Sequence, residues 1–491
     1  MQGKLNEYYD YLHKELYSKT GKSIRFTSSL EFLETSHHLR EGLEMLVTSL
    51  IKIINLAKSN RVTIEDIKKN LEEETHEEIL QFYDLFITIY EEYQKFLSAK
   101  SLIDFNDMIH KVIELFKKDA HVLAKYQHKF QHILVDEYQD VSAAQVELIK
   151  LLLTEDNQLF AVGDDWQSIY GFRGSEIEFI VNFDKEFKGS EVIILPFNYR
   201  SGKNIVDASN IVIMKNPNQV KKQIEAFNNQ KDEKIFQYNA LNDIDGAFFI
   251  IEIVRKLYSE GFRFKDILVL YRRTRHIIPY KEFFNKKTLK INTKTIHGSK
   301  GLESRVVFLV GLTSEGFPYV WEDTRIIQVI KKTNLLKKEE EERRTFYVAM
   351  TRAKEKLFLI SEKNNQSEYC DDIPEEFKKV EVSKREFSEE MLSKVLKETY
   401  DMVQAGKTEA EIAEIMKQDT QKIEVYIANL ISYGLLDIND FVDEKTHETI
   451  SLQLPKNLEH AKLYPIKREL PQNITYGQIR YVIADTKRGR E

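Results

Sequence analysis

The chain has 491 residues, too many for one ordinary hydrophobic core, so about two to four packed units are expected. Hydrophobic residues make up 42% and charged residues 31%, which is typical of folded soluble proteins and excludes global disorder. The net charge of −7 neither favours nor excludes a polyanionic partner, and the single cysteine, Cys370, excludes a disulfide framework. Without a signal-peptide pattern or a long apolar run, the sequence predicts a cytoplasmic protein with no membrane contact.

The predicted elements change in character at about residue 126. Before it, apolar residues recur three and four positions apart, as in 41–59 and 77–99, which predicts helices almost throughout. After it, short apolar runs end in polar or acidic residues and alternate with helical stretches, which predicts parallel strands in two successive α/β segments. The strand candidates are "HILVDE", "QLFAVGDD", "EVIILPFN", "DILVLY", "INTKTIH", "RVVFLVGL" and "LFLI".

The last part of the chain has a third character. A charge run at 337–344 is expected to be the solvated start of a helix that continues through "EEERRTFYVAMTRAKEK", and the polar stretch 364–379 predicts a linker. Beyond it, "GKTEAEIAEIMKQDTQKIEVYIANLISYGLLD" predicts two helices joined by a tight turn. Thr408 and Glu411 have capping-box spacing for the first helix, and Thr420 is expected to cap the second.

Two adjacent carboxylates form the strongest candidate site. Asp136 and Glu137 directly follow the apolar run of "HILVDEYQD", and in an open parallel sheet such a strand end faces the ligand crevice. Nucleotide hydrolysis needs one carboxylate to hold Mg²⁺ and another to orient or deprotonate the attacking water. Taken alone, the pair fits two surface acids after a buried strand equally well.

The loop "FAVGDDWQSIYGFRG" (160–174) strengthens the functional interpretation. It combines acids and a glutamine with Trp166, Tyr170 and Phe172. A glutamine near phosphates can sense a γ-phosphate, and exposed aromatic rings beside an arginine suit stacking on unpaired bases. The alternative for the three rings is ordinary core packing.

Five motifs in this order resemble those of the UvrD/Rep-type superfamily 1 DNA helicases, with helicase IV as the most similar type. They are "VDEYQD", "GDDWQSIYGFRG", "LPFNYRS", "TIHGSKGLE" and "EERRTFYVAMTRAK", and the resemblance covers roughly 100 to 360. It implies an α/β fold of RecA-like motor domains, the first of them incomplete, with an N-terminal helical insertion domain. The cofactors that it implies are ATP and Mg²⁺, and the partner is single-stranded DNA or a junction of single and double strands.

The resemblance also assigns roles in the first motor domain. Asp136 would bind Mg²⁺, Glu137 would be the catalytic base, and Gln167 would couple the γ-phosphate to DNA movement. Tyr170 and Phe172 would stack on bases. Three further residues would touch the DNA backbone: Thr295, His297 and Lys300.

Four residues of the second motor domain would contact the nucleotide. Tyr199 would stack on adenine, Arg200 would reach the γ-phosphate, Glu303 would contact the nucleotide and Arg352 would act as an arginine finger. The two arginines suit this role because a fixed positive fork can stabilise charge on the transferring phosphoryl oxygens. For either arginine alone, a surface ion pair would be the more common role.

The resemblance predicts five segments and one missing domain. Only the 21 residues 274–294 separate "ILVLYRR" from "TIH", where family members such as UvrD insert a domain called 2B, so 2B is expected to be absent or vestigial. The predicted segments are a helical 1B-like insertion domain (1–100), a partial first motor domain (101–192), a second motor domain (193–362), a linker (363–384) and a helix-turn-helix domain (385–491).

No stretch of the sequence fits the phosphate-binding P-loop that the family's first motor domain carries. In "SKTGKS" (18–23) the first glycine of G-x-x-x-x-G-K-[ST] falls at Leu16, after a helical pattern, so a polar turn is expected there. In "AGKT" (405–408) it falls at Asp401, and "SGKN" (201–204) lacks the hydroxyl residue. Three explanations follow: a fragment, which we favour, a motor whose P-loop comes from a separate polypeptide, or a degenerate homologue.

Two interpretations of function therefore stand. The first is an ATP-dependent DNA helicase that moves 3′→5′, in a chain that shows little ATPase activity by itself. The alternative is a non-catalytic DNA-binding or accessory protein derived from a helicase. The C-terminal module resembles one appended to some RecQ-type helicases, and its second helix, about 420–433, contains Lys422 as its only cation. Contact of this module with DNA and contact with protein are therefore equally expected.

Overall fold

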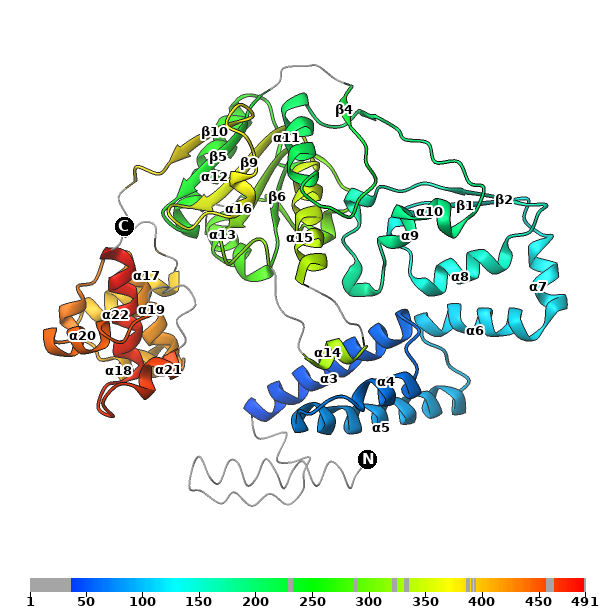
Figure 1. The fold of residues 1–491 in the computed structure, drawn as a ribbon. Helices are drawn as coiled ribbons and strands as arrows, with labels where there is room; N and C mark the ends of the chain where they lie inside the picture. The colour runs from blue at the N-terminus through cyan, green and yellow to red at the C-terminus, as the bar shows by residue number, and fades with distance from the viewer. Residues whose placement is uncertain are drawn as a thin grey trace. The chain divides into compact units, whose positions relative to one another are not determined.

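The computed structural model describes two units of the chain (Figure 1). Unit 1 comprises the described residues within Met1–Ile193, Asn218–Val220 and Trp321–Glu341, and unit 2 comprises those within Ile194–Pro217, Lys221–Val320 and Glu342–Glu491. The described residues are 37–227, 233–286, 289–319, 325–330, 335–385, 389, 392, 394–455 and 463–489. The predicted polar turn at 18–23 lies outside them.

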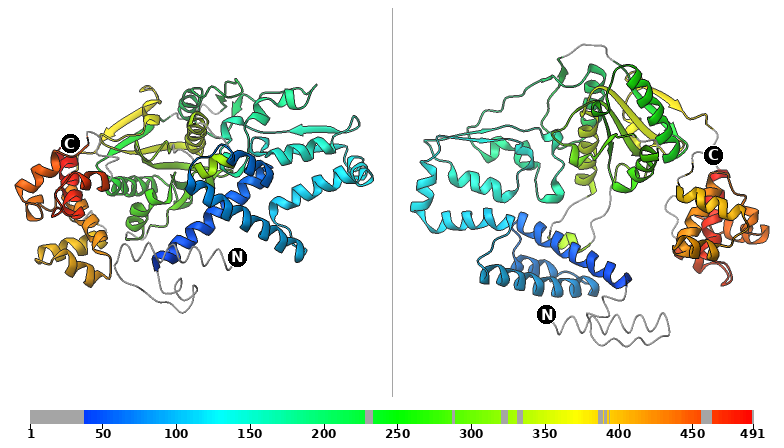
Figure 2. Two further views of the ribbon diagram at one scale, coloured as in Figure 1. Left: turned by 60° about the horizontal axis from the view of Figure 1, so that its bottom comes forward. Right: turned by 180° about the vertical axis from the view of Figure 1, so that it is seen from behind.

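Unit 1 begins with a helical bundle, which confirms the helices that the periodicity of the sequence predicts. Its long helices are α3 (His37–Ser59) and α5 (Glu77–Ala99), which lie side by side with α4 (Ile64–Leu71) in Figures 1 and 2. Thr63 caps α4 through a capping box with Asp66. The remaining helices of unit 1 include α6 (Phe105–Lys118), α7 (Ala120–Gln127), α8 (Ala143–Leu152), α9 (Glu178–Val181), α10 (Phe183–Glu186) and α14 (Arg325–Ile330).

A segment distant in sequence completes the core of this bundle. The α14 residues Val329 and Ile330 pack in the same apolar cluster as Tyr83 and Phe86 of α5. Asn70 of α4 donates a hydrogen bond to the backbone oxygen of Val329 at 2.8 Å. Since α14 lies more than 200 positions away in sequence, helical periodicity alone could not predict this contact.

The described strands of unit 1 form a two-stranded parallel sheet of β1 (His132–Val135) and β2 (Gln158–Ala161). Both strands alternate between exposed and partly buried residues. Leu134 and Phe160 are register partners, and their side chains are 73% and 61% exposed. The exposed face of this sheet therefore presents two large apolar side chains beside His132 and Gln158.

The predicted strand in "EVIILPFN" is largely wrong. Only Phe197–Asn198 form a strand, β3, which pairs in parallel with β4 (Glu225–Ala226). The residues from Val192 to Leu195 have no regular structure, and Ile193 and Leu195 are 74% and 75% exposed. A β-branched run forms a strand only where a neighbouring strand pairs with its backbone, and none of the described residues does so here.

Unit 2 contains a six-stranded parallel sheet in the order β10-β5-β9-β8-β6-β7, which confirms the α/β fold. The strands are β5 (Ile235–Ala240), β6 (Ile267–Tyr271), β7 (Asn292–Thr295), β8 (Ser304–Leu312), β9 (Ala353–Glu362) and β10 (Lys378–Val382). The helices around this sheet are α11 (Lys203–Ile213), α12 (Asp243–Ser259), α13 (Thr274–Lys286), α15 (Leu335–Met350, which begins in unit 1) and α16 (Glu368–Asp371).

The sheet of unit 2 is apolar on both faces. Val269, Phe308 and Ile360 pack with α12 and α13 on one face, where Gly246 of α12 lies so close to Ile360 that a Cβ would be 2.9 Å from its side chain. Val307 and Leu359 on the other face are equally buried, and α11 and α15 lie on that side (Figure 1). Burial on both faces explains the continuous apolar runs of these strands.

Two boundaries differ from the predictions. The helix predicted to continue to Lys356 ends at Met350, because the backbone from Ala353 onward pairs as β9 with β8 and β5. The segment 363–384, expected to be a linker, contains α16 and β10, and β10 pairs with β5 along its whole length. Tyr369 and Cys370 are buried, so the few apolar side chains of this polar stretch pack it against the rest of unit 2.

The C-terminal domain is a small helical bundle. The capping box of Thr408 and Glu411 at the start of α18 is confirmed, whereas α19 is capped by Asp419 and not by the predicted Thr420. Ile423 and Ile427 of α19 are fully buried. The helices are α17 (Lys394–Gln404), α18 (Glu409–Met416), α19 (Thr420–Ser432), α20 (Glu444–Ser451), α21 (Leu463–Arg468) and α22 (Tyr476–Gly489). Among the described helices, none is long and apolar enough to cross a bilayer.

Candidate nucleotide and nucleic-acid site

The predicted acidic pair lies at the carboxyl end of β1. Asp136 and Glu137 are both exposed, and the backbone N–H of Glu137 donates a hydrogen bond to Asp136 Oδ1 at 2.8 Å. Glu137 has left-handed backbone angles, with φ 50° and ψ 43°. Since few non-glycine residues adopt this conformation, it marks a candidate functional position where the backbone turns sharply out of the strand.

The acidic pair fits Mg²⁺ only together with a phosphate ligand. Within the described part of the chain, no group of three or more His, Cys, Asp or Glu side chains could hold a metal ion by itself. Mg²⁺ usually keeps several waters and is bound by one or two carboxylates plus substrate phosphates. The exposed carboxylate of Asp136 is suited to such a shared site.

A buried glutamine joins the acidic pair to the loop 160–174. Gln139 is 1% exposed, its Nε2 donates to Glu137 Oε2, and its Oε1 accepts from the backbone N–H of Asp164 at 2.9 Å. Gln167 in turn donates from Nε2 to Asp164 Oδ2 at 2.8 Å. A chain of hydrogen bonds therefore connects the predicted base to the predicted γ-phosphate sensor. Sequence reasoning missed Gln139, although it stands in the quoted motif "VDEYQD".

The aromatic residues of the loop differ in how far they are exposed to solvent. Trp166 is 1% exposed and belongs to the core, as the alternative interpretation expected, whereas the Phe172 side chain is 47% exposed. The rings of Tyr170 and Phe172 meet edge to face at 6.0 Å, and the Arg173 guanidinium lies 4.9 Å and 5.4 Å from their centroids. This cluster offers a π surface and a positive charge together, which suits contact with bases and phosphates.

The tip of the loop is also held by α15. The backbone N–H of Gly171 donates to Glu341 Oε1 at 3.2 Å. A Cβ at Gly171 would lie 2.6 Å from Glu341 Oε2, so a larger residue there would have to displace the Glu341 carboxylate. The backbone directly before Phe172 is therefore held by this hydrogen bond.

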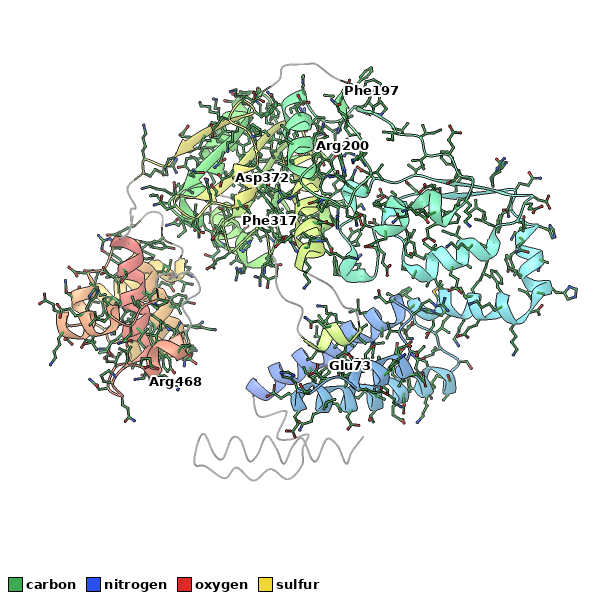
Figure 3. All side chains as sticks on the ribbon, in the orientation of Figure 1. Glu73, Phe197, Arg200, Phe317, Asp372 and Arg468 are labelled. Carbon is green, nitrogen blue, oxygen red and sulfur yellow. The ribbon has the colours of Figure 1, made fainter. Side chains whose placement is uncertain are left out.

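In unit 2, Tyr199 and Arg200 stand just before α11, and Arg200, labelled in Figure 3, contacts the predicted nucleotide residue Glu303. Arg200 Nε donates to Glu303 Oε2 at 2.7 Å, and Lys354 forms a second ion pair with Glu303. Hydrogen bonds from Lys354 and Arg200 hold the pKa of Glu303 below its usual value. The Tyr199 ring is 63% exposed and lies 4.5 Å from the Phe227 ring, so an aromatic pair stands at the surface beside Arg200.

Arg352, the predicted arginine finger, lies in the interior. Its side chain is 1% exposed, and its guanidinium donates to the backbone oxygens of Val348 at 3.0 Å and Leu302 at 3.1 Å. It would have to change rotamer to reach a phosphate at the surface. Its role as a finger stays a prediction.

The three residues predicted to touch the DNA backbone lie at the carboxyl end of β7. Thr295 ends the strand, and His297 and Lys300 lie in and after a short 3₁₀ turn. The Thr295 hydroxyl accepts a hydrogen bond from the backbone N–H of Gly298 at 3.0 Å. All three are partly exposed, so a ligand at this end of the strand could contact them.

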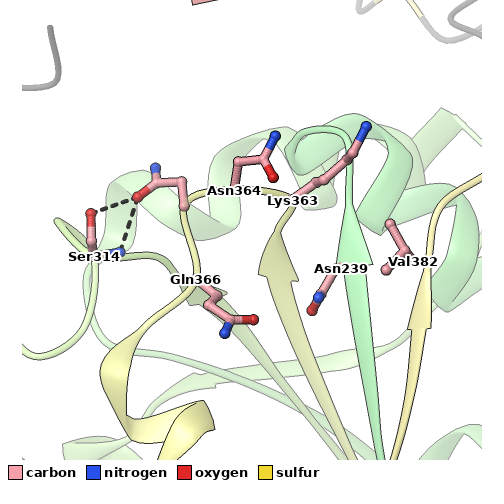
Figure 4. A pocket seen from close by; sticks show the side chains of 7 residues that line it. Asn239, Ser314, Lys363, Asn364, Gln366 and Val382 are labelled. Carbon is pink, nitrogen blue, oxygen red and sulfur yellow. Dashed lines mark hydrogen bonds between the residues drawn. The ribbon is translucent and has the colours of Figure 1, made fainter. Parts of the chain in front are cut away.

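A polar pocket that the sequence did not predict lies at the carboxyl ends of β5, β9 and β10 (Figure 4). Its volume is about 560 Å³, and it is lined largely by amide side chains with Lys363 at its mouth. Gln366 accepts a hydrogen bond from the buried Gln237 at 3.1 Å, and Ser314 bonds Asn365. No residue predicted to contact nucleotide or DNA lines it.

Comparison with known proteins agrees with this arrangement. Residues 4–188 match the UvrD/REP helicase N-terminal domain, and residues 193–294 and 280–364 match the UvrD-like helicase C-terminal domain. Residues 395–483 match a helix-turn-helix domain. The helicase models cover both units, and the third covers most of the C-terminal bundle.

Individual relatives align over part of the chain. The ATP-dependent DNA helicase PcrA of Staphylococcus aureus (strain Mu50) is 40% identical over 202 residues, which are 41% of this chain and 28% of PcrA. That of Staphylococcus epidermidis (strain ATCC 35984) is 36% identical over 229 residues, 46% of this chain and 31% of PcrA. The chain thus covers about a third or less of these relatives.

One solved structure, the C-terminal domain of a possible DNA helicase from Lactobacillus plantarum WCFS1, aligns with 37% of this chain and 98% of its own. Its TM-score of 0.27 and identity of 13% are too low to support an argument. The two helicase domain models and the PcrA relatives instead agree with the motifs and with the α/β fold of unit 2. The chain belongs to the UvrD/Rep-type superfamily 1 helicases and carries a C-terminal helix-turn-helix domain.

Proposed function

We propose that this chain carries the catalytic carboxylates and the DNA-contacting loop of an ATP-dependent helicase that moves 3′→5′ on single-stranded DNA. The observation that supports it is the hydrogen-bonded chain from Glu137 through Gln139 and Asp164 to Gln167, in a loop that also presents Phe172 to solvent. A change in the position of Glu137 on nucleotide binding can therefore be transmitted to the loop that carries Phe172 through three hydrogen bonds. We also propose a cytoplasmic location, because a protein that acts on DNA would meet its substrate there.

The described side chains suggest how nucleotide contacts would form. Bound ATP with Mg²⁺ would supply the phosphoryl group that is transferred to water. Gln139 orients the Glu137 carboxylate, which would take the proton of that water. Arg200 is engaged by Glu303, so its contact with a phosphate competes with this ion pair. We therefore propose that the Arg200–Glu303 pair opens when nucleotide binds.

The whole-protein activity stays a proposal, since the chain covers about a third or less of its PcrA relatives. The 491 residues contain no P-loop pattern after an apolar strand, so the fragment, split-motor and degenerate explanations all stay predictions. No observation supports a separate polypeptide partner. A non-catalytic DNA-binding or accessory protein derived from a helicase stays the alternative.

Helix α19, the second helix of the helix-turn-helix pattern, carries a single cation. Lys422, the only cation of α19, donates a hydrogen bond to Gln418 at 3.3 Å, and Glu424 of the same helix pairs with Arg480. Phosphate contacts supply most nonspecific affinity for DNA. Contact with DNA and contact with protein therefore both stay predictions for this domain.

Replacing Phe172 with alanine is expected to weaken binding of single-stranded DNA about tenfold or more, because stacking is worth ~1–3 kcal/mol per base. The measurement is fluorescence anisotropy of a labelled oligothymidylate titrated with the full chain. Phe130→Ala is the matched control, since Phe130 is another half-exposed phenylalanine of unit 1, 42% against 47% exposed. Equal affinity of Phe172→Ala and the wild type would remove the loop from the DNA site.

A further inference from the structure

The polar pocket of unit 2 lies where parallel sheets usually bind their ligands, at the carboxyl ends of the strands. Asn239 reaches it from β5, and Lys363 and Asn364 reach it from the turn after β9 (Figure 4). Its volume of about 560 Å³ is in the range of sites for small molecules. The described lining residues include no carboxylate and no aromatic ring. The pocket therefore offers no acid to hold a cation and no ring to stack on a base, so its amide groups decide what it binds.

A chain of hydrogen bonds behind the pocket fixes the orientation of two amide groups that line it. Because a carboxylate only accepts hydrogen bonds, the bond between Gln366 and Asp371 places the Gln366 nitrogen beside Asp371. The Gln366 oxygen is thus the atom that meets Nε2 of Gln237 at 3.1 Å. The same Nε2 donates to Asn239 Oδ1 at 2.9 Å, and the Ser361 hydroxyl donates to that oxygen at 2.6 Å. The oxygen of Asn239 is therefore engaged twice, and its nitrogen is left for a ligand.

The groups that remain for a ligand are donors and one positive charge. In the described part of the chain, no residue accepts a hydrogen bond from Asn239 Nδ2, and no acid pairs with the Lys363 ammonium group. Asn365 Oδ1 accepts from the backbone N–H of Ser314 at 3.3 Å, so its nitrogen faces away from that contact. This nitrogen donates one hydrogen to Glu362 at 3.3 Å, and an amide nitrogen carries two. Such an array is complementary to an anion that has several acceptor oxygens.

The residue that orients these amides is buried at a cost in stability. Gln237 is 1% exposed in the middle of β5, and within the described residues its Oε1 has no hydrogen-bond partner. An unpaired buried acceptor destabilises a fold, and an apolar residue at this position of the strand would avoid that loss. A local loss of stability of this kind is typical of functional sites. It is explained here by the fixed donor group that Gln237 gives to the pocket through Asn239.

We propose that this pocket binds a phosphate group, with Lys363 as its counter-ion and Asn239 as a neutral donor. A phosphate group presents several strong acceptor oxygens in a tetrahedral arrangement, which suits donors that come from different strand ends. A neighbouring cavity that shares Asn365 is lined by Asp243 and Glu315, whose negative charges favour an anion on the Lys363 side. No residue with a predicted nucleotide or DNA contact lines the pocket, so the site is additional to the proposed function. The phosphate is carried by a free monoester or by a nucleic-acid strand, and two binding assays distinguish these sources.

Calorimetric titration of the full chain with deoxythymidine monophosphate tests the phosphate site. Asn239→Asp keeps the oxygen that Gln237 and Ser361 contact, but it replaces the donor nitrogen with a negatively charged oxygen. We expect it to weaken binding of the monophosphate about tenfold or more, and Lys363→Met to do the same by removing the counter-ion. Asn292→Asp makes the same change in charge at the exposed start of β7 and should leave the affinity unchanged.

A merely structural role of Asn239 would not respond to Asn239→Asp in this way, because both contacts of its oxygen remain. An accompanying loss of affinity for an oligothymidylate without a terminal phosphate would assign the site to strand phosphates, and an unchanged affinity for it would assign the site to a free monoester. If Asn239→Asp does not fold, Lys363→Met at the partly exposed rim carries the test. Wild-type affinity for the monophosphate in the folded variants, or no binding by the wild type, would overturn the inference and leave the proposed function intact.

Discussion

Glu137→Gln is expected to lower ATP turnover by ~10²–10⁴-fold, the usual contribution of a general base, in a polypeptide that unites this site with a P-loop. Nucleotide affinity should not change, because glutamine keeps the size and the hydrogen-bonding oxygen of the side chain. The physical reason is the placement of Glu137: exposed at the end of β1 and oriented by Gln139. Steady-state hydrolysis and nucleotide binding, measured on the same preparation, check both expectations.

Glu155→Gln provides the matched control for this substitution. Glu155 is also exposed and lies in the turn between α8 and β2, and it has no predicted role. Its variant should hydrolyse ATP as the wild type does. Turnover retained by Glu137→Gln would contradict its assignment as the base, whereas loss of nucleotide binding would indicate a damaged site.

Lys58→Met is expected to lower the free energy of unfolding of the helical part of unit 1 by about 3–5 kcal/mol, the cost of removing one partner of a buried ion pair. Lys58 is 6% exposed, and its ammonium group contacts Asp104 at 2.6 Å and Asp107 at 2.7 Å. Tyr93 also donates to Asp104. The variant would leave two partly buried carboxylates without their cation.

Lys52→Met controls for the loss of a lysine from α3, since Lys52 is exposed on the same helix. Urea unfolding, with hydrogen exchange of the α3, α5 and α6 amides, should show a large loss of protection for Lys58→Met and little for Lys52→Met. Equal stability of the two variants would show that the buried pair contributes little.

This ion pair should also make stability depend on pH. Partial burial raises the pKa of Asp104, but hydrogen bonds from Lys58 and from the Asp107 backbone outweigh it and hold the pKa below the usual 3.8. A carboxyl whose pKa is lowered by folding stabilises the protein above its unfolded pKa. The contribution is therefore present at neutral pH and lost as the pH falls below 3.8 through the lowered pKa. Lys58→Met should remove most of it.

Long periodic helices and buried strands could be predicted from the sequence. Helix α5 has the bounds that its apolar spacing predicts, and β6 and β8 follow their apolar runs, because periodicity reports local burial directly. The run 191–198 was mispredicted, since a strand also needs a partner that the sequence does not show. The charge run 337–344 lies at the start of a helix as predicted, but it is solvated only in part, because Glu342 is buried against Arg272.

The candidate site shows the same division between local and long-range information. The motifs located Asp136, Glu137 and Phe172 at exposed positions, because each stands where a strand ends or a loop turns. They did not predict that Arg352 is buried or that Gln219 bonds Trp166. These facts depend on contacts between residues about 50 positions apart, which no motif records.

We propose that these 491 residues hold the carboxylate and DNA-contacting parts of a helicase motor, and no P-loop pattern stands in their sequence. The most direct test is ATP hydrolysis by the purified chain, with and without single-stranded DNA, in a sample shown to bind that DNA. The account predicts hydrolysis near background in both conditions. Hydrolysis that DNA stimulates to the rates of ordinary helicases would contradict it.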